Sequence, residues 1–441
     1  VVVGDVVALQ LDGVRVPVAV RATAALFPTL SADPGFILVN RGDLEALAAL
    51  LETSSARSPG ELWMDLEEGT PQVREATVAA LAGRDDARLL VVFCSERHDL
   101  HELLGAINLE SGRVPLIGCS TAGEIATGGP DDEGVVIFAL GGPGFSITTA
   151  VAEHASHDLR AAGATGASAA LGVDVTKHSV LLMLTDALAG DQQEILRGAY
   201  GVVGASIQLV GGCAGDDLKM ERTFQLHGDS VLSDAIVTAA ITSDAPIGIG
   251  VRHGWTTIGQ PMLVTRSSGK TVHELDGRPA LDVYLELLEA PTTSLHDTAS
   301  FTRFAMLHPL GLARRSAEPH VRFVAGADFA TRALECFASV PEGAAIWLMQ
   351  GDAESVLTAT DAACHDALDA ISPHRPAGLL AFDCIARRGV LTDDGIHREI
   401  ARIAHLSGGA PVAGFYTYGE IARTRGVSGF HNDTLVVLAV A

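Results

Sequence analysis

The sequence predicts an α/β protein in which βαβ-plus-strand modules repeat and form mixed, largely parallel sheets. The first observation is a motif, G-x-x-T-x-G-E-I, that occurs at residues 118–125 and 414–421, with a poorer copy at 211–218. The second observation is that each copy follows two short apolar runs that flank a helix-like segment. Continuous apolar strands around an amphipathic helix are typical of a parallel pair buried on both faces. Such units are almost always right-handed, so we expect one topology for all three copies.

Each module is expected to contain a strand, a helix, a second strand, the glycine motif and a returning strand. The strands and helices are predicted at 89–94, 100–107, 114–117 and 135–140, at 179–185, 192–200, 207–210 and 235–241, and at 378–383, 397–406, 411–413 and 435–440. The motif then falls at the carboxyl end of a strand, where open α/β sheets collect their ligands. Glycines there permit positive φ angles and leave backbone amide groups available to bind a ligand.

The segments outside the modules are expected to form smaller elements. Residues 6–18 are typical of a hairpin with Asp12 and Gly13 at its turn. Residues 53–60 have the composition of a linker. Further elements are predicted as a strand at 36–40, helices at 43–52 and 71–81, a strand within 247–255, a helix from Pro279 to Leu288, and a βαβ-like step over 321–371.

Composition excludes several classes of function. The 441 residues can hold two or three domains, and a hydrophobic content of 48% supplies their cores. A formal net charge of −24 repels nucleic acid and anionic lipid, so we expect no nucleic-acid partner. No apolar run approaches the ~20 residues needed to span a bilayer, and we expect no membrane insertion. Six cysteines scattered singly, without metal-ligand spacing, favour a cytoplasmic location and no metal site.

Several spaced motifs resemble the FIST family. The first two modules with residues 247–255 resemble the N-terminal FIST domain. Residues 269–280, 308–311, 340–343, 382–387, the third glycine motif and 430–434 resemble the C-terminal FIST domain. We therefore predict an N-terminal extension of unknown role at 1–58, a FIST N-like domain at 59–255 and a FIST C-like domain at 256–441.

The resemblance implies a sensory role. FIST domains occur with kinases, cyclic-nucleotide enzymes and chemotaxis receptors, and small ligands such as amino acids are proposed for them. Nothing in the sequence resembles such an output module, so we expect signalling through a partner such as a histidine kinase or a cyclic-nucleotide enzyme. Some related proteins are haem-containing nitric oxide sensors, which makes haem the alternative cofactor.

We predict a cleft between the two FIST-like halves that binds an amino-acid-like ligand. An ammonium and a carboxylate group need partners of opposite charge, and the motifs supply glutamates and an arginine nearby. The alternatives are that each glutamate ties down its own turn, that Arg387 forms an internal salt bridge to Glu420, and that Asn432 stabilises a turn. The predicted ligand-binding residues are Gly123, Glu124, Arg387, Tyr416, Gly419, Glu420, His431 and Asn432.

Two other hypotheses use different residues. If haem binds, an imidazole must hold its iron, and the candidates are His431, His253 and His308. A thiol- or serine-dependent hydrolase would use Cys119, Ser120 or Cys213. However, residues 118–123 miss the G-x-S-x-G pattern by one position, and Tyr416 aligns with Ser120 in the third copy. We therefore assign no catalytic residue, and a scaffold without a pocket is the remaining alternative.

Overall fold

A computed structural model describes residues 6–11, 14–19, 69–81, 85–174, 177–313, 319–423 and 429–441. The chain divides into two compact units, residues 1–57 and 58–441. In the smaller unit, β1 (Val6–Leu11) and β2 (Val14–Ala19) form the predicted antiparallel hairpin. The expected turn at 12–13, the elements at 36–40 and 43–52, and the linker at 53–60 lie outside the described residues.

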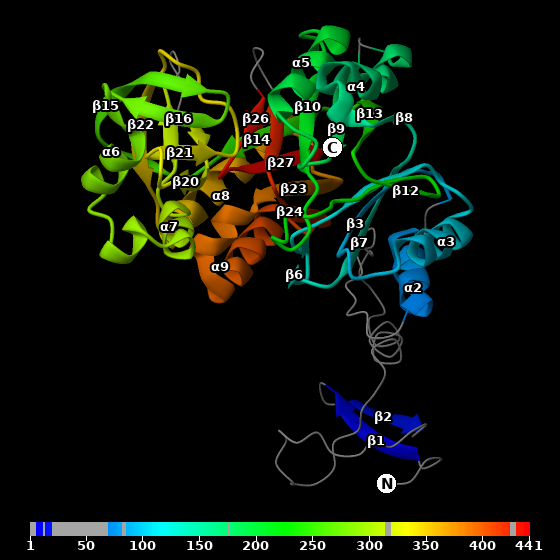
Figure 1. Cartoon of the computed structure of the whole chain (residues 1–441). Coiled ribbons are helices and arrows are strands. Elements are labelled where there is room, and N and C mark those ends of the chain that lie inside the picture. Colours follow the sequence, from blue (N-terminus) through cyan, green and yellow to red (C-terminus); the bar gives the residue numbers. More distant parts are fainter. Residues whose placement is uncertain are drawn as a thin grey trace. The chain divides into compact units, whose positions relative to one another are not determined.

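The larger unit contains the three predicted modules, each with one parallel strand pair (Figure 1). The modules are β3 (Ala87–Cys94), α3 (Leu100–Ser111) and β4 (Leu116–Ser120), then β9 (His178–Thr185), α5 (Gln192–Val203) and β10 (Gln208–Cys213), then β23 (Gly378–Cys384), α9 (Ile385–Leu406) and β24 (Val412–Thr417). Helices α3 and α5 begin after Asp99 and Asp191, whose carboxylates accept backbone N–H groups of the first turn. The third module has no such loop, because α9 follows β23 directly.

The returning strands β7 (Val135–Gly141), β13 (Ala235–Ser243) and β27 (Leu435–Val440) also form where they are predicted. They run antiparallel to β3, β9 and β23. The α/β class is confirmed, but the sheets are not largely parallel, because the described pairs outside the three modules are antiparallel. The physical reason is that the chain returns from each glycine motif through short turns and strands. A further parallel pair would need a helical crossover there.

The strand after each glycine motif joins the sheet of a different module. Strand β5 (Glu124–Ala126) pairs with β24 of the third module, and β25 (Glu420–Arg423) pairs with β10 of the second. Strand β11 (Gln225–His227) pairs with β4 of the first module and closes the ring. The three motifs therefore meet. Backbone N–H groups of Ala122, Cys213 and Gly215 donate to the carbonyls of Tyr416, Gly419 and Ser120 at 3.1, 2.8 and 3.0 Å.

Close packing explains the first glycine of every motif copy. A Cβ atom at Gly118, Gly211 or Gly414 would lie 2.3, 1.9 or 2.0 Å from a carbonyl oxygen of the paired strand. The three glycines occupy equivalent places in the three parallel pairs, so Gly211 confirms the poorer copy. Behind them, the rings of Phe93, Phe382 and Phe415 pack against one another across the first and third modules.

A mostly antiparallel β structure separates the second and third modules. It has its own core, and its strands form an eight-stranded sheet. Its elements are β15 (Thr256–Ser268), β16 (Thr271–Leu275), β17 (Arg278–Pro279), α6 (Ala280–Leu287), α7 (Thr298–Ala305), β18 (Leu310–Leu312), β19 (His320–Arg322), β20 (Val324–Asp328), β21 (Ala333–Cys336) and β22 (Ala345–Gln350). The predicted βαβ-like step at 321–371 is wrong. Helix α8 (Ala353–Ile371) leads from β22 to a strand of another sheet.

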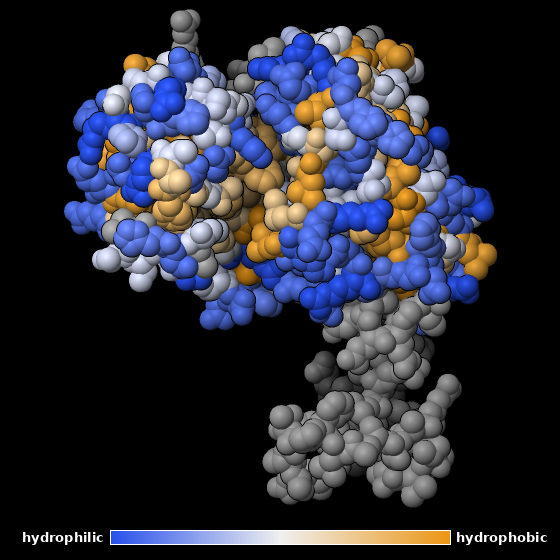
Figure 2. All heavy atoms as spheres, viewed as in Figure 1, coloured by the Kyte–Doolittle hydropathy of each residue, from blue (hydrophilic) through white to orange (hydrophobic). Residues whose placement is uncertain are grey.

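Smaller elements complete the larger unit. They are α2 (Gly69–Leu81), β6 (Gly129–Asp131), β8 (Ser146–Glu153), α4 (Leu159–Gly166), β12 (Ser230–Leu232), β14 (Ile247–Arg252) and β26 (Phe430–His431). Helix α2 and strand β14 confirm two predictions. Figure 2 shows a mainly hydrophilic face, with apolar residues gathered in a hollow near the middle of this unit. Among the described residues, no helix has both the length and the apolar composition required to cross a membrane.

Candidate functional site

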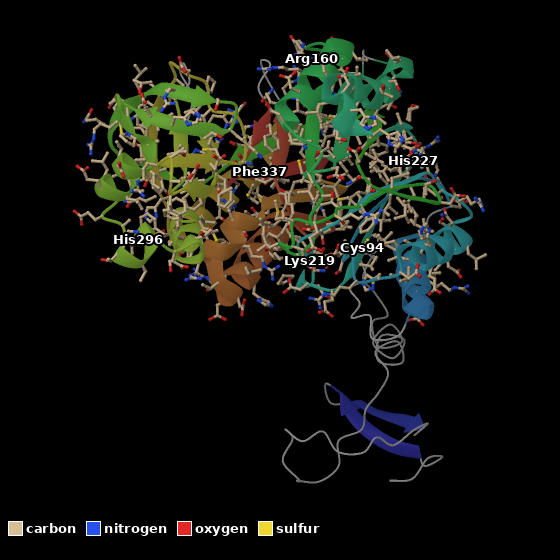
Figure 3. All side chains as sticks on the ribbon, viewed as in Figure 1. Cys94, Arg160, Lys219, His227, His296 and Phe337 are labelled. Atoms are coloured by element: carbon tan, nitrogen blue, oxygen red, sulfur yellow. The ribbon has the colours of Figure 1, made fainter. Side chains whose placement is uncertain are left out.

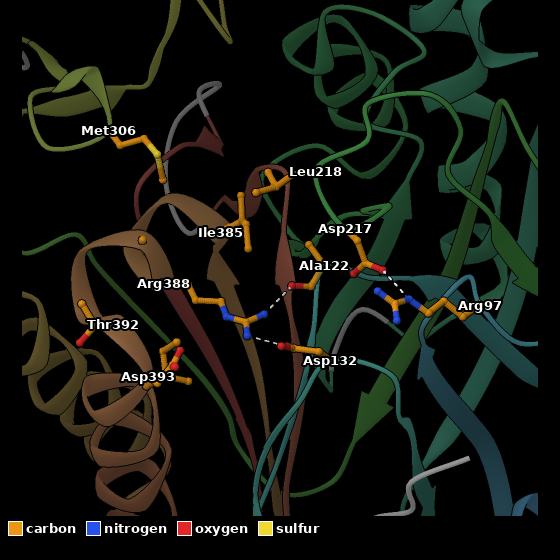
Figure 4. Close-up of a pocket in the computed structure, with 12 residues that line it drawn as sticks. Arg97, Ala122, Asp132, Asp217, Leu218, Met306, Ile385, Arg388, Thr392 and Asp393 are labelled. Carbon is orange, nitrogen blue, oxygen red and sulfur yellow. Dashed lines mark hydrogen bonds and ion pairs between the residues drawn. The ribbon is translucent and has the colours of Figure 1, made fainter. Parts of the chain in front are cut away.

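A pocket of about 440 Å³ lies where the first glycine motif meets the beginning of α9 (Figure 4). We call it the rim pocket. Loops after the strands of the first module, the second glycine motif, α7 and α9 contribute to its wall. It is lined by Arg97, Ala122, Asp132, Asp217, Leu218, Met306, Ile385, Arg388, Gly389, Thr392, Asp393 and Ile396. The pocket therefore combines residues of both predicted FIST-like halves at the carboxyl ends of parallel strands, as the motif positions predict.

The guanidinium group of Arg388 is the central charge of the rim pocket. It donates to the carbonyl oxygen of Ala122 at 3.1 Å and forms an ion pair with Asp132 at 2.5 Å. It also lies over the ring of Tyr416, 5.1 Å from the ring centroid. These contacts hold the guanidinium in one orientation while 21% of the side chain stays exposed. Arg388 is thus preorganised to bind a carboxylate.

A second pair of opposite charges lies across the pocket. The Nε atom of Arg97 is 3.7 Å from Asp217, and the same arginine pairs with Glu133. Partial burial raises the pKa of Asp217, although Arg97 and Lys219 oppose that rise. The rim pocket therefore offers guanidinium and carboxylate groups together, which is the arrangement that a ligand with both charges requires.

Apolar groups and an irregular helix form the rest of the wall. Ile385 and Ile396 come from α9, and Leu218 comes from the second motif. Between the two isoleucines, Thr392 has φ 58° and ψ 173°, so the helix is interrupted there. A β-branched residue at positive φ is a strained conformation, and such strain is concentrated at functional sites.

The predicted glutamates are fully buried and bind their own turns. Glu124 accepts hydrogen bonds from the hydroxyl of Thr121 and from the N–H of Gly134, the latter at 3.0 Å. Glu420 accepts the hydroxyl of Thr417 at 2.5 Å and the N–H of Thr434 at 3.3 Å. Burial raises the pKa of Glu124 to about 8 and that of Glu420 well above its usual value. These hydrogen bonds agree with the alternative that each glutamate stabilises its own turn. Neither glutamate lines the rim pocket.

Arg387 is buried one position away from the arginine that reaches the pocket. Its Nε donates to Asp383 and its Nη2 donates to Glu399, both at 2.6 Å. Further bonds run to the hydroxyl of Thr360 at 2.8 Å and to the carbonyl of His253 at 2.9 Å. The expected internal salt bridge therefore exists, but Arg387 pairs with Asp383 and Glu399 rather than with Glu420. Successive helical residues point about 100° apart, so one arginine enters the core while the next faces the rim.

The other predicted residues divide into two groups. Gly123, with φ 118°, and Tyr416 do not line the rim pocket, but both lie against Arg388: a Cβ at Gly123 would be 2.5 Å from that guanidinium, which also lies over the Tyr416 ring. Gly419, with φ 152°, packs against Phe430 at the third motif. His431 contacts the carbonyl of Ala422 at 3.0 Å and the ring of His320. Gly419, His431 and the buried Asn432 do not line the rim pocket.

The residues of the haem and hydrolase hypotheses are engaged in local contacts. The Nδ1 atoms of His253 and His308 lie 2.9 Å from the Trp255 nitrogen and 2.7 Å from the Phe304 oxygen. Figure 3 labels two other histidines, His227 and His296, on opposite sides of the larger unit. No group of three or more metal-ligating side chains occurs among the described residues.

The nucleophile candidates are buried at the meeting point of the motifs. The hydroxyl of Ser120 donates to Gly215 at 2.7 Å and accepts the N–H of Phe224 at 2.9 Å. Burial raises the pKa of the Cys119 and Cys213 thiols well above their usual range. Both thiols are therefore protonated at neutral pH, which is the opposite of an activated nucleophile.

Comparisons with known proteins identify two domains. The FIST N domain matches residues 88–278, and the FIST C domain matches residues 280–423. An uncharacterised protein of Methanocaldococcus jannaschii is 26% identical over 250 residues, which are 52% of this chain and 47% of that protein. This chain thus spans about half the length of that relative.

A second relative matches over most of its length. An uncharacterised protein of Mycobacterium tuberculosis (strain H37Rv) is 26% identical over 380 residues, 82% of this chain and 95% of that protein. Among solved structures, a cyanuric acid hydrolase from A. caulinodans covers 86% of this chain and 98% of its own, with 10% identity and a TM-score of 0.33.

Proposed function

Since the chain belongs to the FIST family, we propose that it is a sensory protein that binds a small zwitterionic ligand in the rim pocket. FIST domains are associated with ligand binding in signal transduction. The ligand we propose is an amino acid or a close relative, and the signal passes to a partner such as a histidine kinase or a cyclic-nucleotide enzyme. We also propose a cytoplasmic location, which the six unpaired, buried cysteines support.

One observation carries this proposal: opposite charges from both matched domains converge on one hollow. Arg97, Asp132 and Asp217 belong to the FIST N region, and Arg388 belongs to the FIST C region. A volume of about 440 Å³ lies within the usual range for small-molecule sites. A ligand in this place contacts both domains, so its binding can change how they pack, as a sensor requires.

The geometry suggests how each ligand group is held. The carboxylate of the ligand binds the Arg388 guanidinium and replaces Asp132 there. The ammonium group lies against Asp217, and an aliphatic side chain packs against Ile385 and Ile396. Each ligand charge thereby meets a group of opposite sign, and the displaced Asp132, which is already 61% exposed, is left in solvent.

A thermal-shift screen of the twenty amino acids tests the proposal. We expect at least one to raise the thermal midpoint of the wild type, and we expect Arg388→Gln to abolish that shift. Arg398→Gln is the matched control, because Arg398 lies on the same helix, exposed and paired with Glu354 at 3.2 Å. An equal shift in Arg388→Gln and wild type, or no shift with any amino acid, contradicts the proposed ligand and site.

A further inference from the structure

We propose that the interruption of α9 at Thr392 is a hinge that converts occupancy of the rim pocket into movement of residues 393–406. The inference rests on the proposed function, because it requires a ligand in the rim pocket. It adds the moving part and the direction in which the signal travels.

The backbone conformation of Thr392 is the first reason to place a hinge here. Its angles, φ 58° and ψ 173°, break α9 into two helical segments, residues 385–391 and 393–406. Proline, glycine pairs and inserted side chains are the usual causes of a sharp break, and Thr392 itself is none of these. The surrounding structure must hold the residue in this conformation, which leaves a strained point that a change in those surroundings can release.

The rim pocket also spans the break. Ile385, Arg388 and Gly389 come from the first segment, and Asp393 and Ile396 come from the second. In Figure 4, Thr392 and Asp393 lie on the same side of the pocket as Arg388. A ligand that pulls on Arg388 while packing on Ile396 acts on both segments at once. The angle between the segments is therefore the coordinate most directly coupled to binding.

A buried set of hydrogen bonds connects the two segments. Arg387, next to the pocket arginine, donates across the break to Glu399 at 2.6 Å. It also donates to Thr360 of α8 at 2.8 Å and to Asp383 of β23 at 2.6 Å. Every one of these side chains is buried. A shift at Arg388 is thus transmitted through its neighbour to the second segment and to α8.

The outer face of this assembly is suited to rearrangement. The second segment is held to α8 on the surface by ion pairs of Arg398 with Glu354 at 3.2 Å and of Arg402 with Asp361 at 3.0 Å. Exposed pairs of this kind contribute little stability and can exchange partners. Movement of residues 393–406 therefore changes the charge pattern that α8 and α9 present to a partner.

The strain is tested without any ligand. Glycine adopts positive φ readily, so we expect Thr392→Gly to raise the thermal midpoint by roughly 1–3 °C. Ala401→Gly, at a regular exposed position of the same helix, is expected to lower it by a similar amount. A lower midpoint in Thr392→Gly than in wild type overturns the hinge.

The movement is tested by amide hydrogen exchange on the full chain, with the amino acid that gives the largest thermal shift as the probe. We expect it to slow exchange of residues 393–406 at least about threefold in wild type, and by less in Thr392→Gly. Binding that leaves exchange of residues 393–406 unchanged overturns the hinge and leaves the proposed site standing. Failure of every amino acid to bind overturns the proposed function and this inference together.

Discussion

At the residue scale, Asp433 combines full burial with a carboxylate that has no hydrogen-bond partner among the described residues. It has a φ of 54°, and its carbonyl accepts the indole N–H of Trp255 at 2.9 Å. Burial raises the pKa of Asp433 to about 8, although Arg387 opposes the rise. The folded protein therefore keeps this carboxyl protonated at pH values where the unfolded chain has lost the proton.

This difference predicts how stability depends on pH. An aspartate in an unfolded chain titrates near pH 3.9, so between about pH 4 and pH 8 the folded state binds the additional proton. The proton-linked contribution of Asp433 to the free energy of unfolding is fully present below about pH 4. It is lost progressively as the pH rises through about 8, the pKa of Asp433 in the folded protein. We expect Asp433→Asn to stabilise the protein relative to wild type by about 2–5 kcal/mol more at pH 8.5 than at pH 4.5.

Urea unfolding at the two pH values measures this effect. Asp394→Asn, at an exposed position of α9, is the control and should follow the wild type at both. Parallel curves for wild type and Asp433→Asn across the pH range would show that the carboxyl ionises normally in the folded protein.

A second prediction at this scale concerns Asp132, which is 61% exposed, lines the rim pocket and forms an ion pair with Arg388. If Asp132 competes with the ligand carboxylate, Asp132→Asn should tighten binding of the active amino acid about two- to fivefold. That range corresponds to an exposed ion pair of up to about 1 kcal/mol. Calorimetric titration measures it, with Asp229→Asn as the control, because Asp229 is exposed, pairs with Arg113 and does not line the pocket. Weaker binding in Asp132→Asn would mean that Asp132 holds the ammonium group instead.

At the scale of elements, the sequence predicts the structure correctly where a local pattern decides it. Apolar runs and a periodic helix predict β3, α3 and β4, and the N-cap Asp99 marks where α3 begins. Prediction fails where the structure depends on pairing between strands that are far apart in the sequence. No local feature shows that β7 returns antiparallel, or that residues 321–371 belong to two different sheets. Likewise, Arg387 and Arg388 are adjacent residues of one type, and only the orientation of α9 distinguishes them.

Glycine substitution tests the packing of a parallel pair. At Gly414, an added Cβ would lie 2.0 Å from the backbone oxygen of Ala381, which cannot move without breaking the ladder. We expect Gly414→Ala to destabilise the protein by about 3 kcal/mol or more, measured by urea unfolding. Gly105→Ala is the matched control. That glycine lies in α3 with nothing within 4 Å, so alanine should add up to about 1 kcal/mol. Equal stability of Gly414→Ala and wild type would show that the strands separate easily.

At the scale of the whole molecule, two of the three module sheets unite the two FIST-like halves. Strands β5 and β10 precede residue 255 and pair with β24 and β25. In the same way, β14 pairs with β27 along its whole length. The hydrophobic core around Phe93 and Phe415 also contains residues of both halves. A boundary in sequence is consequently not a boundary in packing, because each half leaves sheet edges that the other half covers.

This architecture predicts that the halves do not fold separately. Fragments 69–255 and 256–441 would each expose unpaired edges of β10, β24 or β27 together with apolar core, which favours aggregation. We expect each fragment alone to be insoluble or without cooperative unfolding, and we expect co-expression to restore a folded complex. Residues 58–441 as one chain form the control and should unfold in a single transition. Two soluble fragments with separate cooperative transitions would contradict the shared sheets. They would also show that the rim pocket, which residues of both halves line, does not depend on the two halves folding together.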